Sequence, residues 1–188
     1  MTTIFSTRTL VTTIAAAVAV SAAFFMTRPA DAGLQLALCE GYTPTIMGTQ
    51  NSETIHGTAG VDVIMALGGN DRIYGHGGND IICAGAGNDT VYGGSGNDTA
   101  HGESGNDSLY GGSGNDYLRG TGGTDVVSGQ AGHDQLFGDD GNNDTVQGGD
   151  GDDYMGGGSG SGDLCDGGLG DDFFTSSCES VIDYLYRP

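Results

Sequence analysis

Aspartate residues recur every nine positions along most of this 188-residue chain. Each lies among glycines and is followed two positions later by an apolar or small residue, as in the segments 93–101 and 111–119. Carboxylate oxygens, together with the backbone carbonyl oxygens that glycine turns expose, are the ligands that hard divalent cations prefer. The pattern therefore suggests cation binding by oxygen atoms. The aspartates that keep this phase are Asp62, Asp71, Asp80, Asp89, Asp98, Asp107, Asp116, Asp125, Asp134, Asp144, Asp153, Asp163 and Asp172.

The apolar residues keep the same phase as the aspartates, and this indicates a structural repeat. The spacing is unbroken from Asp62 to Asp134 and resumes after a one-residue insertion before Asp144 and another before Asp163. Each unit predicts a glycine turn followed by a very short strand of three residues that points its middle residue inward. The predicted inward residues are Ile64, Ile73, Ile82, Val91, Ala100, Leu109, Leu118, Val127, Leu136, Val146, Met155, Cys165 and Phe174.

The copies Gly93 to His101 and Gly111 to Arg119 resemble the nonapeptide G-G-x-G-x-D-x-U-x of the repeat-in-toxin (RTX, haemolysin-type) calcium-binding family, where U is a large apolar residue. The resemblance implies an all-β fold, a right-handed parallel β-roll (a β-solenoid) in which two units form one coil of about 18 residues. In that fold the U residues of two sheets form a thin core. The resemblance also implies calcium as the bound ion.

In such a roll, aspartates two units apart, such as Asp80 and Asp98, become neighbours on successive coils. Bare carboxylates would repel each other there, whereas a dication between them takes one oxygen from each and completes its shell with backbone carbonyls. Calcium accepts such a flexible cage of oxygens more readily than magnesium does. The thin core cannot offset the ordering entropy of so many glycines. We therefore expect a chain that is disordered without calcium and folds when calcium binds.

The charge balance is strongly acidic, with 25 Asp and Glu residues against 5 Lys and Arg and a formal net charge of −20. Nucleic acid is excluded as a partner, because the chain has no basic patch. Divalent cations bound along the roll would cancel most of this charge. We interpret the acidity as the ion-free state of a calcium array rather than as a means of solubility.

Residues 1–32 have the features of a secretory signal peptide: Arg8 near the start, an uncharged run, and the small-residue cleavage site Ala30-Asp31-Ala32. An uncleaved membrane anchor is the alternative. We expect a secreted, extracellular protein without a membrane span after cleavage. Residues 33–54 are predicted as an N-terminal cap, 55–175 as the β-roll and 176–188 as a C-terminal cap, because stacked repeats need covered ends. RTX toxins are mostly exported through a C-terminal signal, so this chain differs from them.

An even number of cysteines in a secreted chain predicts disulfides. The four are Cys39, Cys83, Cys165 and Cys178. Cys83 is predicted to lie on the one apolar outer patch of the roll, which requires a cover, and the segment that contains Cys39 can provide it. Cys165 lies near the last repeat and Cys178 follows it. We therefore expect the pairs Cys39–Cys83 and Cys165–Cys178. A zinc site is disfavoured because no C-x-x-C motif or histidine cluster occurs. The apolar residues of the outer patch are Val63, Met65 and Ile81.

Two further sets of side chains are assigned to the surface. The histidines His56, His76, His101 and His133 occupy different positions of their repeats, so no column of ligands is expected and each is predicted to face solvent. Tyr74, Tyr92 and Tyr110 are two units apart and are predicted to stack on one face. A stabilising aromatic ladder is favoured there over a ligand platform.

The expected function is calcium binding without enzymatic activity. Neither an H-E-x-x-H zinc site nor a G-x-S-x-G nucleophile elbow occurs, and the segment before the repeats is too short for the catalytic domain that RTX proteases and lipases carry. An adhesion or structural rod is one alternative, and an accessory module of an RTX-type toxin or hydrolase is another. An ice-binding rod would need a sustained threonine ladder, which the column Thr90, Thr99, Ser108, Tyr117, Val126 does not provide.

Overall fold

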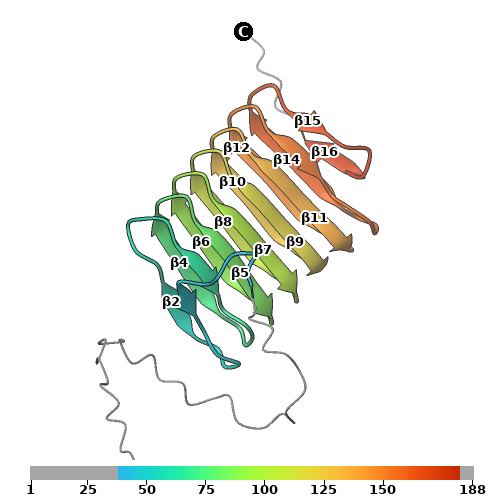
Figure 1. The fold of residues 1–188 in the computed structure, drawn as a ribbon. Coiled ribbons are helices and arrows are strands. Elements are labelled where there is room, and N and C mark those ends of the chain that lie inside the picture. The colour runs from blue at the N-terminus through green and yellow to red at the C-terminus, as the bar shows by residue number, and fades with distance from the viewer. Residues whose placement is uncertain (1–37, 183–188) are drawn as a thin grey trace, which may run out of the picture. The chain divides into compact units, whose positions relative to one another are not determined.

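A computed structural model describes residues 38–182, which form two parallel β-sheets that lie face to face (Figure 1). Consecutive strands alternate between the sheets, so each pair completes one coil. No helix occurs in the described range. Sheet 1 contains, in spatial order, β1 (Ile46–Met47), β3 (Val63–Met65), β5 (Ile81–Ala86), β7 (Thr99–Ser104), β9 (Tyr117–Gly123), β11 (Gln135–Gly141), β13 (Tyr154–Gly156) and β15 (Phe173–Phe174). Sheet 2 contains β2 (Thr54–His56), β4 (Arg72–Gly77), β6 (Thr90–Ser95), β8 (Ser108–Ser113), β10 (Val126–Ala131), β12 (Thr145–Asp150), β14 (Leu164–Leu169) and β16 (Ser180–Ile182).

The parallel β-roll predicted from the repeat is confirmed. Strand β6 pairs in parallel with β4 and β8, and its Val91 lies opposite Ile73 and Leu109, each two units away. The inward residue of every predicted unit from Ile64 to Cys165 is buried, and Phe174 packs against the core from the last coil. Ile55 extends this core by one unit toward the N-terminus. The core is therefore a single file of apolar side chains from each sheet.

Ten of the sixteen strands in residues 38–182 are longer than the three residues predicted, and the other six, near the two ends, have two or three. Strand β6 continues from Thr90 through Gly93 and Gly94 to Ser95, and Gly94 pairs with Gly112 of the next coil. The stacking explains this, because each coil presents the same backbone groups in the same order and the hydrogen-bond ladder continues around the turn. Gly94 has φ +116°, and a Cβ there would collide with the backbone oxygen of His76. Glycine is needed at this close approach.

Both one-residue insertions are absorbed in turns and leave the sheets intact. Strand β9 pairs with β11 at a separation of 18 residues up to Gly123 and Gly141, whereas Val126 pairs with Thr145 at 19. The first extra residue therefore lies between Gly141 and Thr145. The later pair Thr145 and Leu164 shows the same separation. The aspartates after each insertion consequently remain in line with those before it.

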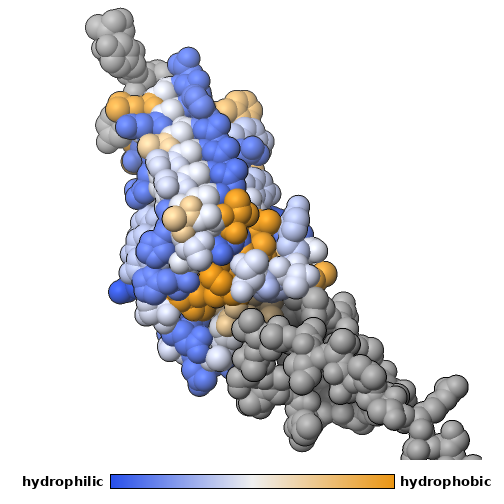
Figure 2. Space-filling view, turned by 60° about the vertical axis from the view of Figure 1, so that its left-hand side comes forward, coloured by the Kyte–Doolittle hydropathy of each residue, from blue (hydrophilic) through white to orange (hydrophobic). Residues whose placement is uncertain are grey.

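The N-terminal end of the roll carries the predicted disulfide between Cys39 and Cys83. Both cysteines are buried with Met65 in a second apolar cluster on the outer face of sheet 1, against Val63, Leu67 and Ile81. The predicted cover of the outer patch is thus present. Apolar surface is concentrated toward the N-terminal end of the face seen in Figure 2, and most of the remaining surface there is hydrophilic.

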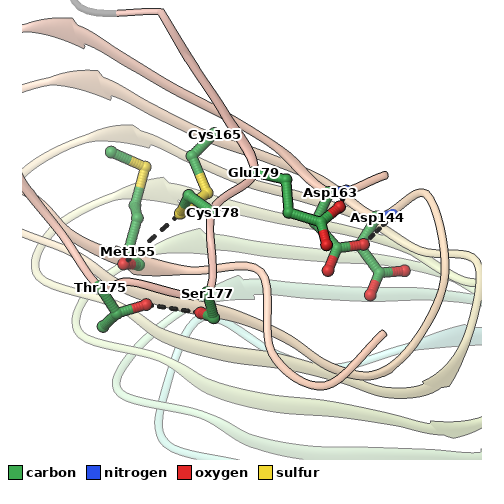
Figure 3. The surroundings of a disulfide bond; sticks show 8 residues. All are labelled: Asp144, Met155, Asp163, Cys165, Thr175, Ser177, Cys178 and Glu179. Atoms are coloured by element: carbon green, nitrogen blue, oxygen red, sulfur yellow. Dashed lines mark hydrogen bonds between the residues drawn. A yellow bond between two sulfur atoms is a disulfide. The ribbon is translucent and has the colours of Figure 1, made fainter. Parts of the chain in front are cut away.

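The C-terminal end carries the second predicted disulfide, between Cys165 of β14 and Cys178 (Figure 3). After Cys178, strand β16 pairs in parallel with β14 and so continues sheet 2 beyond the last repeat. Leu169, Phe173 and Val181 are exposed at this end. The predicted signal peptide, residues 1–32, lies outside the described residues. Within residues 38–182 no helix is long and apolar enough to cross a membrane.

Candidate calcium-binding columns

The structure arranges the repeated aspartates in two columns, one along each edge of the roll where the chain passes between the sheets. Along each column, the aspartate of one coil lies next to its counterpart on the following coil. All of them except Asp172, which is partly exposed, are buried. Column 1 contains Asp62, Asp80, Asp98, Asp116, Asp134, Asp153 and Asp172; column 2 contains Asp71, Asp89, Asp107, Asp125, Asp144 and Asp163.

One carboxylate oxygen of each aspartate is used within the fold. The backbone N–H of Asp80 donates to Oδ1 of Asp98 at 2.8 Å, and the N–H of Asp89 donates to Oδ1 of Asp107 at 2.7 Å. The same bond links Asp125 to Asp144 at 2.8 Å across the first insertion. These bonds fix the orientation of each side chain.

The other carboxylate oxygen is buried without a hydrogen-bond partner in ten of these aspartates. A buried polar atom without a partner costs free energy comparable to a lost hydrogen bond, and more when the group is charged. A repeated cost of this kind indicates a missing partner rather than an accident of packing. The ten unpartnered oxygens are Oδ2 of Asp71, Asp80, Asp89, Asp98, Asp107, Asp116, Asp125, Asp134, Asp144 and Asp153.

Most of these oxygens lie so close to a glycine that a side chain could not be accommodated there. A Cβ added at Gly75 would lie 2.5 Å from Oδ2 of Asp80 and also against the backbone oxygen of Gly93 on the next coil. The same two kinds of oxygen surround the position of a Cβ at Gly93 and at Gly102. Glycine at the first position of the unit thus allows a carboxylate oxygen and a carbonyl oxygen to converge, and we call this pair of oxygens a cradle. A hard cation such as calcium fits this donor set.

The local electrostatics also favour a cation. The pKa of Asp107 and of Asp116 is raised to about 7, chiefly by burial and also by the aspartates on the neighbouring coils, although the backbone hydrogen bond to each lowers it. Burial likewise raises the pKa of Asp80, Asp125 and Asp153 to about 6. Without a positive charge, these columns hold carboxylates that resist ionisation near neutral pH.

Glutamates extend column 2 at both ends, which the sequence reasoning missed. The N–H of Glu53 donates to Oδ1 of Asp71 at 2.7 Å. Oε2 of Glu179 accepts hydrogen bonds from the N–H groups of Gly162 and Asp163, and Figure 3 shows Glu179 beside Asp163. Glu53 could have been found, because it lies two units before Asp71 in the same phase. Glu179 could not, because the turn at the second disulfide breaks the phase.

The prediction for the histidines was wrong for His101. Its side chain is buried, and Nε2 lies 3.4 Å from Oε1 of Glu40 in the segment that the first disulfide holds. His56 and His76 are exposed, as expected, but His56 Nδ1 lies 3.1 Å from His76 Nε2. The two rings are neighbours because His56 is the last residue of its unit and His76 is the second residue of a later unit, and these two positions adjoin on the face of sheet 2. The predicted tyrosine stack is present, with ring centroids of Tyr74, Tyr92 and Tyr110 separated by 5.0 and 5.2 Å.

No group of three or more His, Cys, Asp or Glu side chains gathers around a point that could hold a metal ion anywhere in residues 38–182. Side chains alone therefore do not form a metal site in this part of the chain. Any cation in the columns would need backbone carbonyl oxygens as well, which the glycine cradles supply.

The profile of the RTX calcium-binding nonapeptide repeat matches this chain in several overlapping copies that together span residues 47–174. Each match contains repeats whose aspartates lie in the two columns. No curated protein matches the chain. The matched span covers most of the chain and coincides with the stacked coils, and the chain therefore belongs to the RTX calcium-binding nonapeptide repeat family.

Proposed function

We propose that this protein is secreted and binds an array of calcium ions along both edges of the roll, and that binding drives the folding of the coils. One observation carries the proposal: ten buried carboxylate oxygens without hydrogen-bond partners recur in phase, most of them beside a glycine cradle. Calcium would supply the positive charge that these oxygens lack.

The residues that would hold the ions are the aspartates of the two columns and the backbone carbonyls of the first glycine in each unit, such as Asp98 with Gly111. The aspartates fix one oxygen by hydrogen bonding to the previous coil and present the other to the cradle. Because each cradle combines atoms of two successive coils, an ion bound there would hold the coils together. This coupling predicts cooperative binding.

Secretion is supported by the chemistry of the chain. Two disulfides suit an oxidising compartment, and residues 1–32 have the composition of a signal peptide. Extracellular calcium-binding modules bind with dissociation constants of about 10⁻⁴ to 10⁻³ M, so the chain would stay ion-free before export. We propose no enzymatic activity; the biological role would be that of a calcium-stabilised structural module.

Isothermal titration calorimetry tests the binding. Calcium should bind at several equivalents per chain, and magnesium at the same concentration should give little heat. Absence of calcium binding would refute the proposal. Secretion is tested separately by N-terminal sequencing of protein recovered from the culture medium, where a mature chain beginning at Gly33 is expected; retention of the protein in the cell would contradict secretion.

A further inference from the structure

Resting on the proposed function, we infer that the calcium array has a defined start inside the roll, and that the coils before it fold without calcium and serve as a template for the rest. We call the segment from Cys39 to Ala86, which contains β1 to β5, the N-terminal block. Three features distinguish it from the later coils: threonine caps on the first carboxylate of each column, methyl groups in the cradles of column 2, and apolar packing on both faces of sheet 1. Its two other column acids, Asp71 and Asp80, keep an unpartnered Oδ2.

Threonines satisfy the first carboxylate of each column. Oδ2 of Asp62 accepts hydrogen bonds from the N–H of Thr58 at 2.7 Å and from its hydroxyl at 2.9 Å. Glu53 stands at the start of column 2, and its carboxylate accepts the hydroxyl of Thr49 at 2.6 Å and the N–H of Thr49 at 3.1 Å. In both cases the threonine lies four residues before the acid. These hydrogen bonds supply the partners that the later carboxylates lack.

Methyl groups close the next two cradles of column 2. Ala66 and Ala84 occupy the first position of their units, where the units that follow have glycine, and both are fully buried in the core cluster. At the equivalent Gly102, an added Cβ would collide with Oδ2 of Asp107 and lie 2.7 Å from the oxygen of Gly120. By this register, the methyl of Ala84 lies where the cradle beside Asp89 would be, and that of Ala66 fills the cradle beside Asp71.

The array therefore begins at Asp80 in column 1, at the C-terminal edge of the N-terminal block, and at Asp107 in column 2, beyond the block. Asp80 is the first acid of its column that combines an unpartnered Oδ2 with a glycine cradle, at Gly75. Asp107 is the first in column 2, with Gly102. From these two residues to Asp153, every aspartate of both columns has an unpartnered Oδ2 that lies against a glycine.

The N-terminal block has other sources of stability instead. Its inward residues are all isoleucines, whereas Ala100 later leaves a smaller side chain in the core. The outer face of its sheet 1 strands packs against a second apolar cluster that includes Met65, and the Cys39–Cys83 disulfide fastens this cluster. Strands β3 and β5 are thus buried on both faces, and apolar burial contributes about 25 cal/mol per Å². The inward isoleucines are Ile46, Ile55, Ile64, Ile73 and Ile82.

A preformed block would present an ordered edge on which the next coil can stack. Adding a coil to an existing edge avoids the nucleation cost of ordering two coils together, as in other linear repeat proteins. Calcium would then order coils in sequence from the block toward the C-terminus. The Cys39–Cys83 disulfide and the threonine caps on Glu53 and Asp62 therefore define where folding starts.

Hydrogen–deuterium exchange of the full chain, with disulfides intact, tests the inference. In chelator, peptides from 45–86 should stay protected, while peptides from 93–155 should exchange as fast as an unfolded chain; calcium should protect both. Loss of protection in both regions in chelator, with recovery in calcium, would overturn the inference and leave the proposed function standing. Full protection of both in chelator would contradict the proposed function itself. Protection of 93–155 alone would also overturn the inference.

A substitution tests the closed cradle directly. Ala84→Gly removes the methyl beside Asp89 and should add a calcium equivalent in calorimetry. Ala86→Gly is the matched control, because it introduces the same flexibility at an exposed position of the same strand and should leave the stoichiometry unchanged. If Ala84→Gly binds no more calcium than Ala86→Gly while both fold in calcium, the methyl does not close a site and the inference fails. Should Ala84→Gly fail to fold, Ala66→Gly, which removes the methyl beside Asp71, replaces it with the same expected gain.

Discussion

Oδ1 of Asp98 accepts the backbone N–H of Asp80 at 2.8 Å, while Oδ2 of the same carboxylate is buried without a hydrogen-bond partner. The two oxygens thus have different roles. The first ties one coil to the previous one, and the second is left for a ligand beside Gly93. Because this relationship recurs along both columns, it permits separate tests of the fold and of the ion site.

Replacing Asp98 with Asn should weaken calcium binding and largely preserve the coil. The amide oxygen can still accept the N–H of Asp80, but the negative charge is lost. We expect the loss of at least one calcium equivalent, or affinity about tenfold lower, which corresponds to about 1.4 kcal/mol. Asp150→Asn removes the same charge from an exposed position and is the control. Equal calorimetric titrations for the two variants would show that Asp98 is not a ligand.

Filling one glycine cradle should abolish the ion site at a position where φ itself allows a side chain. A Cβ at Gly111 would collide with Oδ2 of Asp116 and lie 2.8 Å from the oxygen of Gly129. Gly111→Ala should therefore reduce calcium stoichiometry and lower the free energy of unfolding in calcium by about 1–3 kcal/mol. At Gly122 the nearest atom to an added Cβ is 3.6 Å away, so Gly122→Ala should behave as wild type in denaturant unfolding. A Gly111→Ala protein with unchanged stoichiometry would rule out the cradle.

Protonation of the buried aspartates at low pH should stabilise the folded coils in part when calcium is absent. Burial raises the pKa of Asp107 and Asp116 to about 7 in the folded chain, from about 3.9 when unfolded. A raised folded pKa means that the folded state binds more protons, so this contribution to stability is present below about pH 4 and is lost as the pH rises through about 7. In chelator, β-structure measured by circular dichroism should be greater at about pH 5 than at about pH 8. A larger signal at the higher pH would contradict the assignment of these carboxylates as buried and ion-free.

The two disulfides should differ in their contribution to stability. Cys39 and Cys83 are separated by 44 residues, and Cys165 and Cys178 by 13. Loop-closure entropy predicts that removing the first pair by Cys→Ala costs about 1 kcal/mol more than removing the second. Denaturant unfolding of the two double variants in calcium measures the difference. A greater loss for the Cys165–Cys178 variant would show that strain or core packing outweighs chain entropy.

Much of the fold follows from the phase of the repeat. Ile64 and the inward residues after it were predicted because apolar positions two residues after aspartate must share one face, and all lie in or against the core. Both disulfides followed from the outer apolar patch at Cys83 and from the position of Cys165 near the last coil. The aspartate columns followed from the same period, and their stacking survives both insertions.

Other features depend on contacts that no period reveals. His101 is buried because the disulfide-held segment brings Glu40 over it. The repeat places His101 beside Cys83, but it does not show that the covering segment reaches one coil further to His101. The caps on Asp62 and Glu53 depend on the rotamers of Thr58 and Thr49. The long strands arise because stacked coils hydrogen-bond through their turns, which local propensity at glycine does not predict.

A calcium titration followed by circular dichroism, starting from protein in chelator at neutral pH with its disulfides intact, tests the central claim most directly. The buried, unpartnered oxygens from Asp98 to Asp153 predict little β signal from the middle of the chain without calcium. Calcium should produce a steep, cooperative gain with a Hill coefficient above one, which chelator reverses and magnesium does not reproduce. Full β signal in chelator, or a gradual non-cooperative rise, would show that the disulfides and apolar core are sufficient to fold the roll and that calcium binding does not drive folding.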